Sequence, residues 1–378
     1  MLTQQNSLTG HIADHIIQAG GWVGFDDFMQ RALYTPGLGY YARDDAQFGH
    51  LPYASCSVDS GLRVAGSDFV TAPELSPLFG QTVAQQVAQA LQVTQTTDIW
   101  EFGAGTGALA LQILQTLQAQ GTALPRYTLV DISGSLRARQ QATLAPFAQH
   151  VRWVSELPDT VEGVVLGNEV LDAMPVKALA RTGGIWHERG VTVCGTADAP
   201  VFAWQDRPTA LRPPHDMEGS HDYLTEIHPQ GQAFVRTLAG KLARGAMFWI
   251  DYGYVQAEYY HPQRAMGTVM CHSAHQSDTD PLARVGQKDI TAHVDFSGVA
   301  LAALEAGLGV LGFCTQAHFL INCGLTARLQ SADLATRVMA QKLIMEHEMG
   351  ELFKVLGVYK GPPWQAMGFV RGDKTHRL

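Results

Sequence analysis

Hydrophobic and polar positions along the middle of the chain alternate in the pattern of strands followed by helices. Short apolar runs bounded by polar or turn residues, which predict strands, occupy residues 98–102, 126–132, 151–154 and 163–168. Between them, apolar residues recur at helical spacing over 109–120 and 135–147. The run at 163–168 is almost wholly apolar, as is typical of a strand covered on both faces. This alternation predicts a parallel, doubly wound α/β sheet with right-handed crossovers.

The pattern changes after this central region. Residues 176–227 consist of β-like pieces punctuated by glycine and proline, and they predict a β-rich insertion. A helix is predicted over 229–245 and a further strand of the sheet over 246–253. The segment 261–287 is polar and rich in turn residues, which indicates a surface excursion.

The two ends of the chain carry weaker patterns. Residues 1–95 contain two or three short helical patterns and an irregular glycine- and proline-rich middle, and they predict a cap over the sheet. Near the other end, 310–316 and 367–372 predict a late hairpin pair. The two strands of this pair are separated by helices predicted over 331–357, where Met and Leu recur at helical spacing.

Composition narrows the function classes. The chain has 378 residues, 46% of them hydrophobic, and a formal net charge of −9, which argues against a nucleic-acid partner. Its five scattered cysteines, without a closely spaced pair, favour a reducing cytoplasm. No secretory signal is expected, because the first residues lack a basic start and a long apolar core. No membrane span is expected, because the longest apolar candidate, 298–314, is broken by Glu305 and four glycines. No metal site is expected either, since the Cys and two His of 271–275 lack a second cluster.

The clearest motif is a glycine loop, EFGAGTGALA at 101–110, between a predicted strand and a predicted helix. Gly103, Gly105 and Ala108 satisfy the dinucleotide-binding fingerprint. Gly103, Gly105 and Gly107 equally satisfy the G-x-G-x-G loop of S-adenosylmethionine-dependent methyltransferases. In both cases the backbone turns sharply and offers N–H groups at a helix N-terminus to the ligand.

Neighbouring residues favour the second alternative. Asp131 ends the next strand, where it accepts hydrogen bonds from a ribose in either class. Glu101, two residues before the first glycine, suits the cationic methionine end of S-adenosylmethionine and would repel a pyrophosphate. A nicotinamide-dependent oxidoreductase often carries a Tyr-x-x-x-Lys relay, and none of the seven lysines has a tyrosine four positions earlier. An NAD(P)-dependent oxidoreductase nevertheless stays open as an alternative.

Several longer motifs resemble those of a known family. They are RALYTPGLGYYAR (31–43), GSDFVTAPELSPLFGQ (66–81), EFGAGTGALA (101–110), LVDIS (129–133), GNEVLDAMPV (167–176), IDYGY (250–254) and QKDITAHVDF (287–296). Together they resemble the MidA family, whose mitochondrial members act in complex I assembly and as protein-arginine methyltransferases. The resemblance extends from about residue 20 to the FKVLG at 353–357.

This resemblance implies a Rossmann-like class I methyltransferase core over 96–378, with insertions at about 176–228 and 256–290, behind the N-terminal cap. It implies S-adenosylmethionine as cofactor and a protein arginine, of a respiratory-chain subunit for example, as methyl acceptor. It further implies that Thr71 and Glu74 line the cofactor site; the structural alternative, that Thr71 or Ser76 caps a helix, stays open. Asp131 and Ile132, at the end of the second strand, are expected to bind the cofactor as well.

The segment GNEVLDAMP at 167–175 follows the fourth predicted strand of the core, at the edge that faces the cofactor. A fixed carboxylate there can hold a guanidinium through two hydrogen bonds and orient it for methylation. Glu169 is the first candidate for this catalytic role and Asp172 the second, while Asn168 is expected to hold the amino-acid end of the cofactor. The alternative is structural: Asn168 caps a short helix that ends before Pro175.

Three hypotheses follow. The first is a methyltransferase acting on a protein arginine, and the second is the NAD(P)-dependent oxidoreductase. The third is an assembly factor without catalytic activity that binds S-adenosylmethionine as a structural ligand. DNA amino-methyltransferases fit poorly, because they carry an Asn/Asp-Pro-Pro-aromatic motif where this chain has Asn-Glu-Val-Leu.

Overall fold

The computed structural model describes residues 7–42, 71–131, 134–196, 199–215, 219–273 and 276–378. The chain divides into two compact units. The smaller comprises Met1–Asp44, Asp172–Phe234 and Tyr254–Val299, and the larger comprises Asp45–Leu171, Val235–Gly253 and Ala300–Leu378. The chain therefore passes between the units several times.

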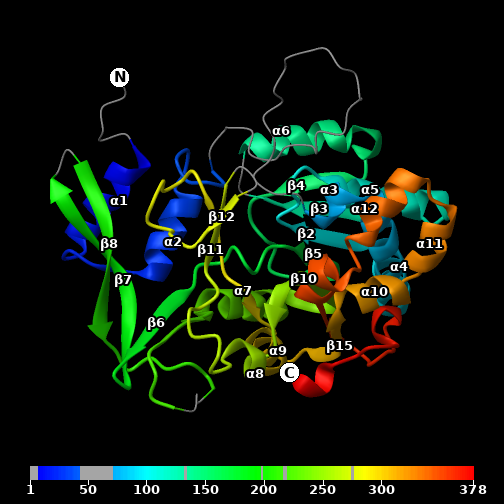
Figure 1. Ribbon diagram of the computed structural model, residues 1–378. Helices are drawn as coiled ribbons and strands as arrows, with labels where there is room; N and C mark the ends of the chain where they lie inside the picture. The colour runs from blue at the N-terminus through cyan, green and yellow to red at the C-terminus, as the bar shows by residue number, and fades with distance from the viewer. Residues whose placement is uncertain (1–6, 43–70, 132–133, 197–198, 216–218, 274–275) are drawn as a thin grey trace. The chain divides into compact units, whose positions relative to one another are not determined.

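The larger unit is built on a sheet whose strands lie side by side in the order β15, β16, β10, β5, β2, β3, β4 (Figure 1). Their bounds, in that order, are Gly309–Thr315, Phe353–Lys360, Leu242–Tyr254, Val161–Asn168, Asp98–Phe102, Arg126–Val130 and Val151–Val154. The strands from β10 to β4 are parallel, whereas β16 is antiparallel to both β10 and β15. The mostly parallel α/β core predicted from the sequence is thereby confirmed, with β5 as its fourth strand in chain order.

Helices complete the larger unit. They are α3 (Ala72–Leu75), α4 (Pro77–Thr94), α5 (Ala108–Ala119), α6 (Gly134–Thr143), α10 (Gln316–Asn322), α11 (Leu325–Ser331) and α12 (Leu334–Gln341), with single turns at Ala145–Phe147, Glu346–Gly350, Met367–Phe369 and Thr375–Arg377. Helix α4 begins where the hydroxyl of Ser76 accepts a hydrogen bond from the N–H of Leu78, with Pro77 in the first turn. Its buried Phe79, Val83 and Val87 recur at helical spacing and join the apolar core beneath the sheet.

The late hairpin differs from the sequence prediction. Strand β15 pairs with β16 at Phe353–Lys360, and residues 367–369 form a single helical turn. The segment 331–357 is therefore helical only in its first part, and its end is a central strand. Six consecutive residues of β16 are buried, so its side chains show no alternation that would have distinguished it from a buried helix.

The smaller unit combines the first two helices with the β-rich insertion. Its elements are α1 (Leu8–Gln18), β1 (Val23–Gly24), α2 (Phe25–Tyr34), β6 (Lys177–Thr182), β7 (Ile185–Thr196), β8 (Ala199–Pro208), β9 (Tyr223–Ile227), α8 (Gln256–Tyr259), β11 (Met270–Ser273), β12 (Gln276–Asp278), β13 (Asp289–Thr291) and β14 (Val294–Asp295). Helices α7 (Pro229–Lys241) and α9 (Phe296–Glu305) run from one unit into the other.

Residues 1–95, predicted as one cap, are shared between the two units. The apolar faces of α1 and α2 bury Ile12, Ile16 and Phe28 in a core that also contains Val191 of β7. In contrast, α4 belongs to the core of the larger unit. Each helix belongs to the unit whose core buries its row of apolar side chains, so the first 95 residues do not form one cap.

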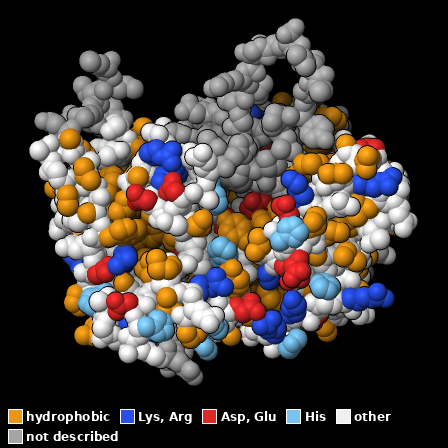
Figure 2. All heavy atoms as spheres, in the orientation of Figure 1, with side chains coloured by type: hydrophobic (Ala, Val, Ile, Leu, Met, Phe, Trp, Pro, Cys, Tyr) orange, Lys and Arg blue, Asp and Glu red, His pale blue; other side chains and the backbone are white. Residues whose placement is uncertain are grey.

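Two surface properties complete the description. None of the described helices is long and apolar enough to cross a membrane. On the face in Figure 2, Lys and Arg side chains are interspersed with Asp and Glu side chains and with apolar ones.

Candidate active site

The glycine loop connects β2 to α5 in the larger unit. Gly103, Gly105 and Gly107 all adopt left-handed backbone conformations, with φ of 61°, 52° and 84°. At Gly103 a Cβ atom would lie 2.9 Å from a methyl group of Val170, in the segment that follows β5. Glycine is therefore required here both for the turn and for the close approach of the two segments.

Strand register brings the candidate residues to one edge of the sheet. Phe102, the last residue of β2, pairs with Val130 of β3 and with Gly167 of β5. Asn168 pairs with Ile250 of β10. The positions at or just beyond these strand ends are Gly103, Asp131, Asn168 and Asp251. They lie at the carboxyl ends of parallel strands, the usual place for ligands in such sheets.

Gln140 of α6 ties the glycine loop to Asp131. Its amide nitrogen donates to the carbonyl of Gly105 at 3.0 Å and to the carboxylate of Asp131 at 2.7 Å. Its amide oxygen accepts from the indole N–H of Trp153 at 2.9 Å. The side chain is fully buried, so these bonds fix the acid relative to the loop. Sequence reasoning missed Gln140, because a glutamine on a helix has no pattern of its own.

Replacing Gln140 by leucine is expected to weaken binding of S-adenosylmethionine by about tenfold, since a hydrogen bond to a carboxylate contributes about 1.5–3 kcal/mol. Leucine retains the volume but leaves Asp131 and the Gly105 carbonyl without this donor. Calorimetric titration measures the effect, and Gln141→Leu, at the exposed neighbouring position of the same helix, is the control. Equal affinities for the two variants would contradict a positioning role for Gln140.

Glu101 lies beneath the loop, 2% exposed, and its carboxylate accepts a hydrogen bond from the hydroxyl of Tyr127 at 2.7 Å. Burial raises the pKa of Glu101 to about 7; the hydrogen bond from Tyr127 opposes this shift and the charge of Asp131 adds to it. Its carboxyl therefore exchanges its proton near neutral pH. A cation bound nearby would favour the charged form.

This shift predicts how stability depends on pH. The pKa of Glu101 rises from 4.5 in the unfolded chain to about 7 in the folded protein. The folded state therefore binds the proton of Glu101 more tightly than the unfolded chain does. The contribution of protonated Glu101 to stability is complete below pH 4.5 and is lost as pH rises to about 7. The loss is on the order of 3 kcal/mol, at about 1.4 kcal/mol per pH unit. We expect denaturant unfolding to show this decline in the wild type and its absence in Glu101→Gln; parallel profiles would contradict the assignment.

Glu169 follows β5 with a left-handed backbone, φ 55°, which is uncommon for a residue other than glycine. Its N–H donates to the carbonyl of Ile250 at 2.9 Å, and its carboxylate accepts from the side-chain nitrogen of Asn168 at 2.9 Å. The residues from 169 to 176 form bends and turns without a helix. The structural alternative, in which Asn168 caps a short helix, is therefore wrong.

Asn168 is also placed to receive a ligand. Its side-chain oxygen is buried and accepts no hydrogen bond from the described residues. A buried acceptor of this kind is costly unless a donor completes it. The ammonium group expected of the cofactor is such a donor, so the free acceptor of Asn168 fits S-adenosylmethionine.

Asp251, in β10 just after its last pair with β5, holds the backbone around Glu169. One carboxylate oxygen accepts from the N–H groups of Val170 and Leu171 at 3.1 and 3.0 Å, and the other accepts from the N–H of Tyr252 at 2.9 Å. The side chain is 1% exposed. Sequence reasoning recorded the residue within the motif IDYGY but assigned it no role.

Asp172, the second acid of the segment, belongs to the smaller unit although it follows Glu169 by three residues. It is buried, and its carbonyl accepts from the N–H of Ala292 at 2.9 Å. Its charge and that of Asp289 both raise the pKa of Tyr34 and Tyr41, after the larger effect of burial. The rings of these two tyrosines stack 5.5 Å apart, and the Tyr41 hydroxyl donates to Asp289 at 2.7 Å.

The two remaining predicted site residues are less informative. Thr71 precedes α3 in the larger unit, and its carbonyl accepts from the N–H groups of Glu74 and Leu75. Its contribution to cofactor binding stays a prediction. Ile132 lies outside the described residues.

Comparisons with known proteins agree with this site. The profile of a family of S-adenosyl-L-methionine-dependent methyltransferases matches residues 82–314. A Burkholderia thailandensis protein, solved with bound S-adenosyl-homocysteine, has 46% sequence identity and a TM-score of 0.89, with 98% of this chain and 96% of that chain covered.

More distant relatives are mitochondrial. The protein arginine methyltransferase NDUFAF7 of Danio rerio is 27% identical, over 93% of this chain and 86% of that protein. The human protein of the same name is 25% identical, over 83% of this chain and 73% of its own length. These matches confirm the resemblance drawn from the motifs, and the chain belongs to this family of S-adenosyl-L-methionine-dependent methyltransferases.

Proposed function

We propose that the protein methylates an arginine side chain of a protein, with Glu169 as the carboxylate that holds the guanidinium. The observation that carries this proposal is the position of Glu169, held in a left-handed backbone conformation at the end of β5 and beside the glycine loop. Unusual backbone conformations of this kind gather at functional sites, where the surrounding structure maintains them. The names of the mitochondrial relatives support arginine as the acceptor residue.

The chemistry suits an acid at this position. When bound, S-adenosylmethionine supplies an electrophilic methyl group on a sulfonium sulfur. An arginine side chain is charged, with a pKa above about 12, and the lone pairs of its nitrogens are delocalised over the guanidinium group. Glu169 would accept two N–H bonds, draw the positive charge toward itself and turn one nitrogen lone pair toward the methyl carbon. That nitrogen forms the new bond, the carbon–sulfur bond breaks, and the nitrogen then releases its extra proton to solvent.

The cofactor is assigned to the rest of the same edge. Asp131, fixed by Gln140, would accept from the ribose hydroxyls. Asn168 and Glu101 would face the cationic amino-acid end, and the loop glycines would admit it close to the backbone. Alignment of nucleophile, methyl and sulfur then supplies most of the acceleration, up to several kcal/mol.

Asp172 is proposed as a second acceptor-binding acid. It shares its surroundings with Asp289 and with the stacked rings of Tyr34 and Tyr41. Carboxylates combined with aromatic faces favour a planar cation such as guanidinium. Asp172 therefore stays the second candidate for the carboxylate that holds the guanidinium, after Glu169.

The acceptor protein is proposed to be a respiratory-chain subunit, following the resemblance to the MidA family. The cytoplasm is the proposed location. The described cysteines support this, because Cys194, Cys271, Cys314 and Cys323 are all free thiols, as expected in a reducing compartment.

A transfer assay tests the proposal. Purified protein is incubated with methyl-labelled S-adenosylmethionine and an extract of cells that lack the enzyme, and the labelled proteins are hydrolysed to amino acids. Label in methylarginine is the expected result. Label in methyllysine would overturn the arginine assignment. Tight cofactor binding without transfer to any protein would favour the assembly factor that uses the cofactor as a structural ligand.

A further inference from the structure

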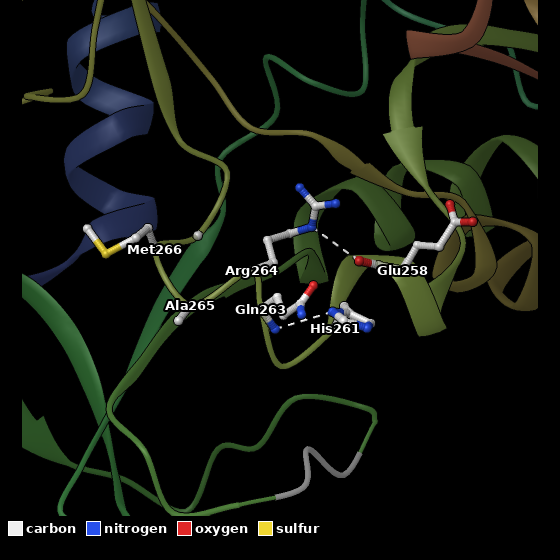
Figure 3. Close-up of a pocket in the computed structure, with 7 residues that line it drawn as sticks. Glu258, His261, Gln263, Arg264, Ala265 and Met266 are labelled. Atoms are coloured by element: carbon white, nitrogen blue, oxygen red, sulfur yellow. Dashed lines mark hydrogen bonds between the residues drawn. The ribbon is translucent and has the colours of Figure 1, made fainter.

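A pocket in the smaller unit has no part in the site described above. It has a volume of about 370 Å³ and is lined by Glu258 of α8 and by His261 and residues 263–267, which follow this helix. This volume is within the range of small-ligand sites. Its one permanently charged cation is Arg264, and Figure 3 shows this side chain at the centre of the pocket residues.

Arg264 is held in a fixed orientation. Its Nε donates to the carbonyl of Glu258 at 3.1 Å, and its guanidinium carbon lies 3.8 Å from the centre of the Tyr254 ring. Tyr254 in turn stacks on His293, with ring centres 5.2 Å apart and planes 8° from parallel. The ring contact occupies one face of the guanidinium, and the hydrogen bond uses Nε. The two terminal nitrogens make no hydrogen bond to the described residues and are available to a ligand. The planar fork of donors is therefore preorganised.

The neighbouring side chains add donors. The Nδ1 atom of His261 accepts from the N–H of Gln263 at 3.2 Å, so a neutral His261 carries its proton on Nε2 as a further donor. The amide of Gln263 also lines the pocket. Glu258 contributes its carbonyl to Arg264, while Figure 3 shows its carboxylate turned away from the guanidinium.

Charged groups of both signs lie near the pocket. Burial raises the pKa of Tyr223; the charge of Arg264 lowers it, that of Glu226 raises it, and that of Arg181, 5.8 Å from the centre of the ring, lowers it. The buried acid Glu226 accepts hydrogen bonds from the hydroxyl of Tyr259 and from the N–H and hydroxyl of Thr268. An anion entering the pocket would therefore meet the guanidinium of Arg264, whose terminal nitrogens make no hydrogen bond to the described residues.

We infer that the Arg264 pocket binds a carboxylate through the two terminal nitrogens of the guanidinium. A planar carboxylate matches this fork with two parallel hydrogen bonds, and the His261 and Gln263 side chains complete the shell. Met266, 83% exposed, adds an apolar contact at the rim. The carboxylate belongs either to an acidic side chain of a partner protein or to a free small acid. The inference does not depend on the proposed arginine methylation.

Titration followed by NMR tests the inference on the full chain. The probes are N-acetylglutamate amide, an acidic peptide with an apolar residue beside glutamate, and inorganic phosphate. The variants are Arg264→Gln and Arg264→Lys, and the control is Arg212→Gln, an exposed arginine of the same unit that is also bonded to carbonyls. Thermal unfolding and S-adenosylhomocysteine affinity confirm that each variant is folded.

We expect saturable binding of both carboxylate probes, at least tenfold weaker in Arg264→Gln, several-fold weaker in Arg264→Lys and unchanged in the control. A peptide that binds at least tenfold more tightly than the single amino acid would identify a protein partner, and equal affinities would identify a free acid. Tighter binding of phosphate, equal affinities in Arg264→Gln and wild type, or no saturable binding would each overturn the inference. Cofactor affinity is unchanged in every case, so this failure is distinct from failure of the methyltransferase assay.

Discussion

Replacing Glu169 by glutamine is expected to lower methyl transfer about 100- to 1000-fold, the usual effect of removing one preorganised electrostatic group. Cofactor affinity should stay within about threefold, because the loop, Asp131 and Asn168 are unchanged and the side-chain oxygen of the new glutamine still accepts from the Asn168 nitrogen. Glutamine has nearly the same shape as glutamate, so the backbone at this position is not perturbed. Only the negative charge that draws on the guanidinium is lost.

The control for this change lies in β5, the strand that Glu169 follows. Glu162 of β5 is exposed and forms an ion pair with Arg244 at 3.1 Å. Glu162→Gln should leave methyl transfer within about twofold of wild type, because an exposed ion pair contributes little. Single-turnover rates with labelled S-adenosylmethionine measure both variants. If Glu169→Gln retained more than about a tenth of the wild-type rate, the carboxylate would not be the group that orients the acceptor.

The central sheet could be predicted because its strands carry local patterns. The bounds predicted for β2 and β4, 98–102 and 151–154, agree with the structure. In both cases a short apolar run is bounded by polar or turn residues on each side. The prediction that 367–372 pairs with β15 was wrong, because the partner of β15 is β16. Strand β16 also pairs with β10, so its hydrogen bonds join distant parts of the chain. No local pattern records such pairing, and the preceding Met and Leu residues favoured a helix.

The N-terminal region shows the same limit. Helices α1 and α2 are visible from their amphipathic patterns, whereas the core that each joins is not. Phe28 packs against Phe202 of β8, with ring centres 5.2 Å apart, across more than 170 positions of sequence. A pattern along one segment indicates that a face is buried, but not what covers it.

Within the site, the sequence showed the residues that carry chemistry and missed those that position them. Glycines at fixed spacing and acids at strand ends are recognisable because their roles require those residue types. Gln140 and Asp251 act through hydrogen bonds to distant elements, and their residue types are ordinary for a helix and a strand end. The left-handed conformation of Glu169 also has no sequence signal, since its neighbours impose it.

Asp251→Ala is expected to destabilise the protein by about 3–4 kcal/mol, because three backbone N–H groups near a buried carboxylate lose their acceptor. Asp251→Asn should cost less, since one amide oxygen still accepts from Val170 and Leu171 while its nitrogen faces the N–H of Tyr252. The matched control is Asp98→Ala, at the first residue of β2 and so at the amino end of the sheet. Asp98 forms an ion pair with Arg126, whose side chain is largely exposed. Its expected cost is about 1 kcal/mol or less. Denaturant unfolding gives all three values.

Activity separates a structural role for Asp251 from a positioning role. At temperatures where Asp251→Asn is fully folded, methyl transfer should still fall at least tenfold, because a shift of about 1 Å at a reacting group costs up to 100-fold in rate. The segment that Asp251 holds carries Glu169, so its loosening displaces the carboxylate. Cofactor affinity, which depends on the glycine loop and Asp131, should change much less than the rate. Equal losses in affinity and rate would mean that Asp251 maintains the whole edge of the sheet, and a loss of stability with normal rate would mean that it has no influence on Glu169.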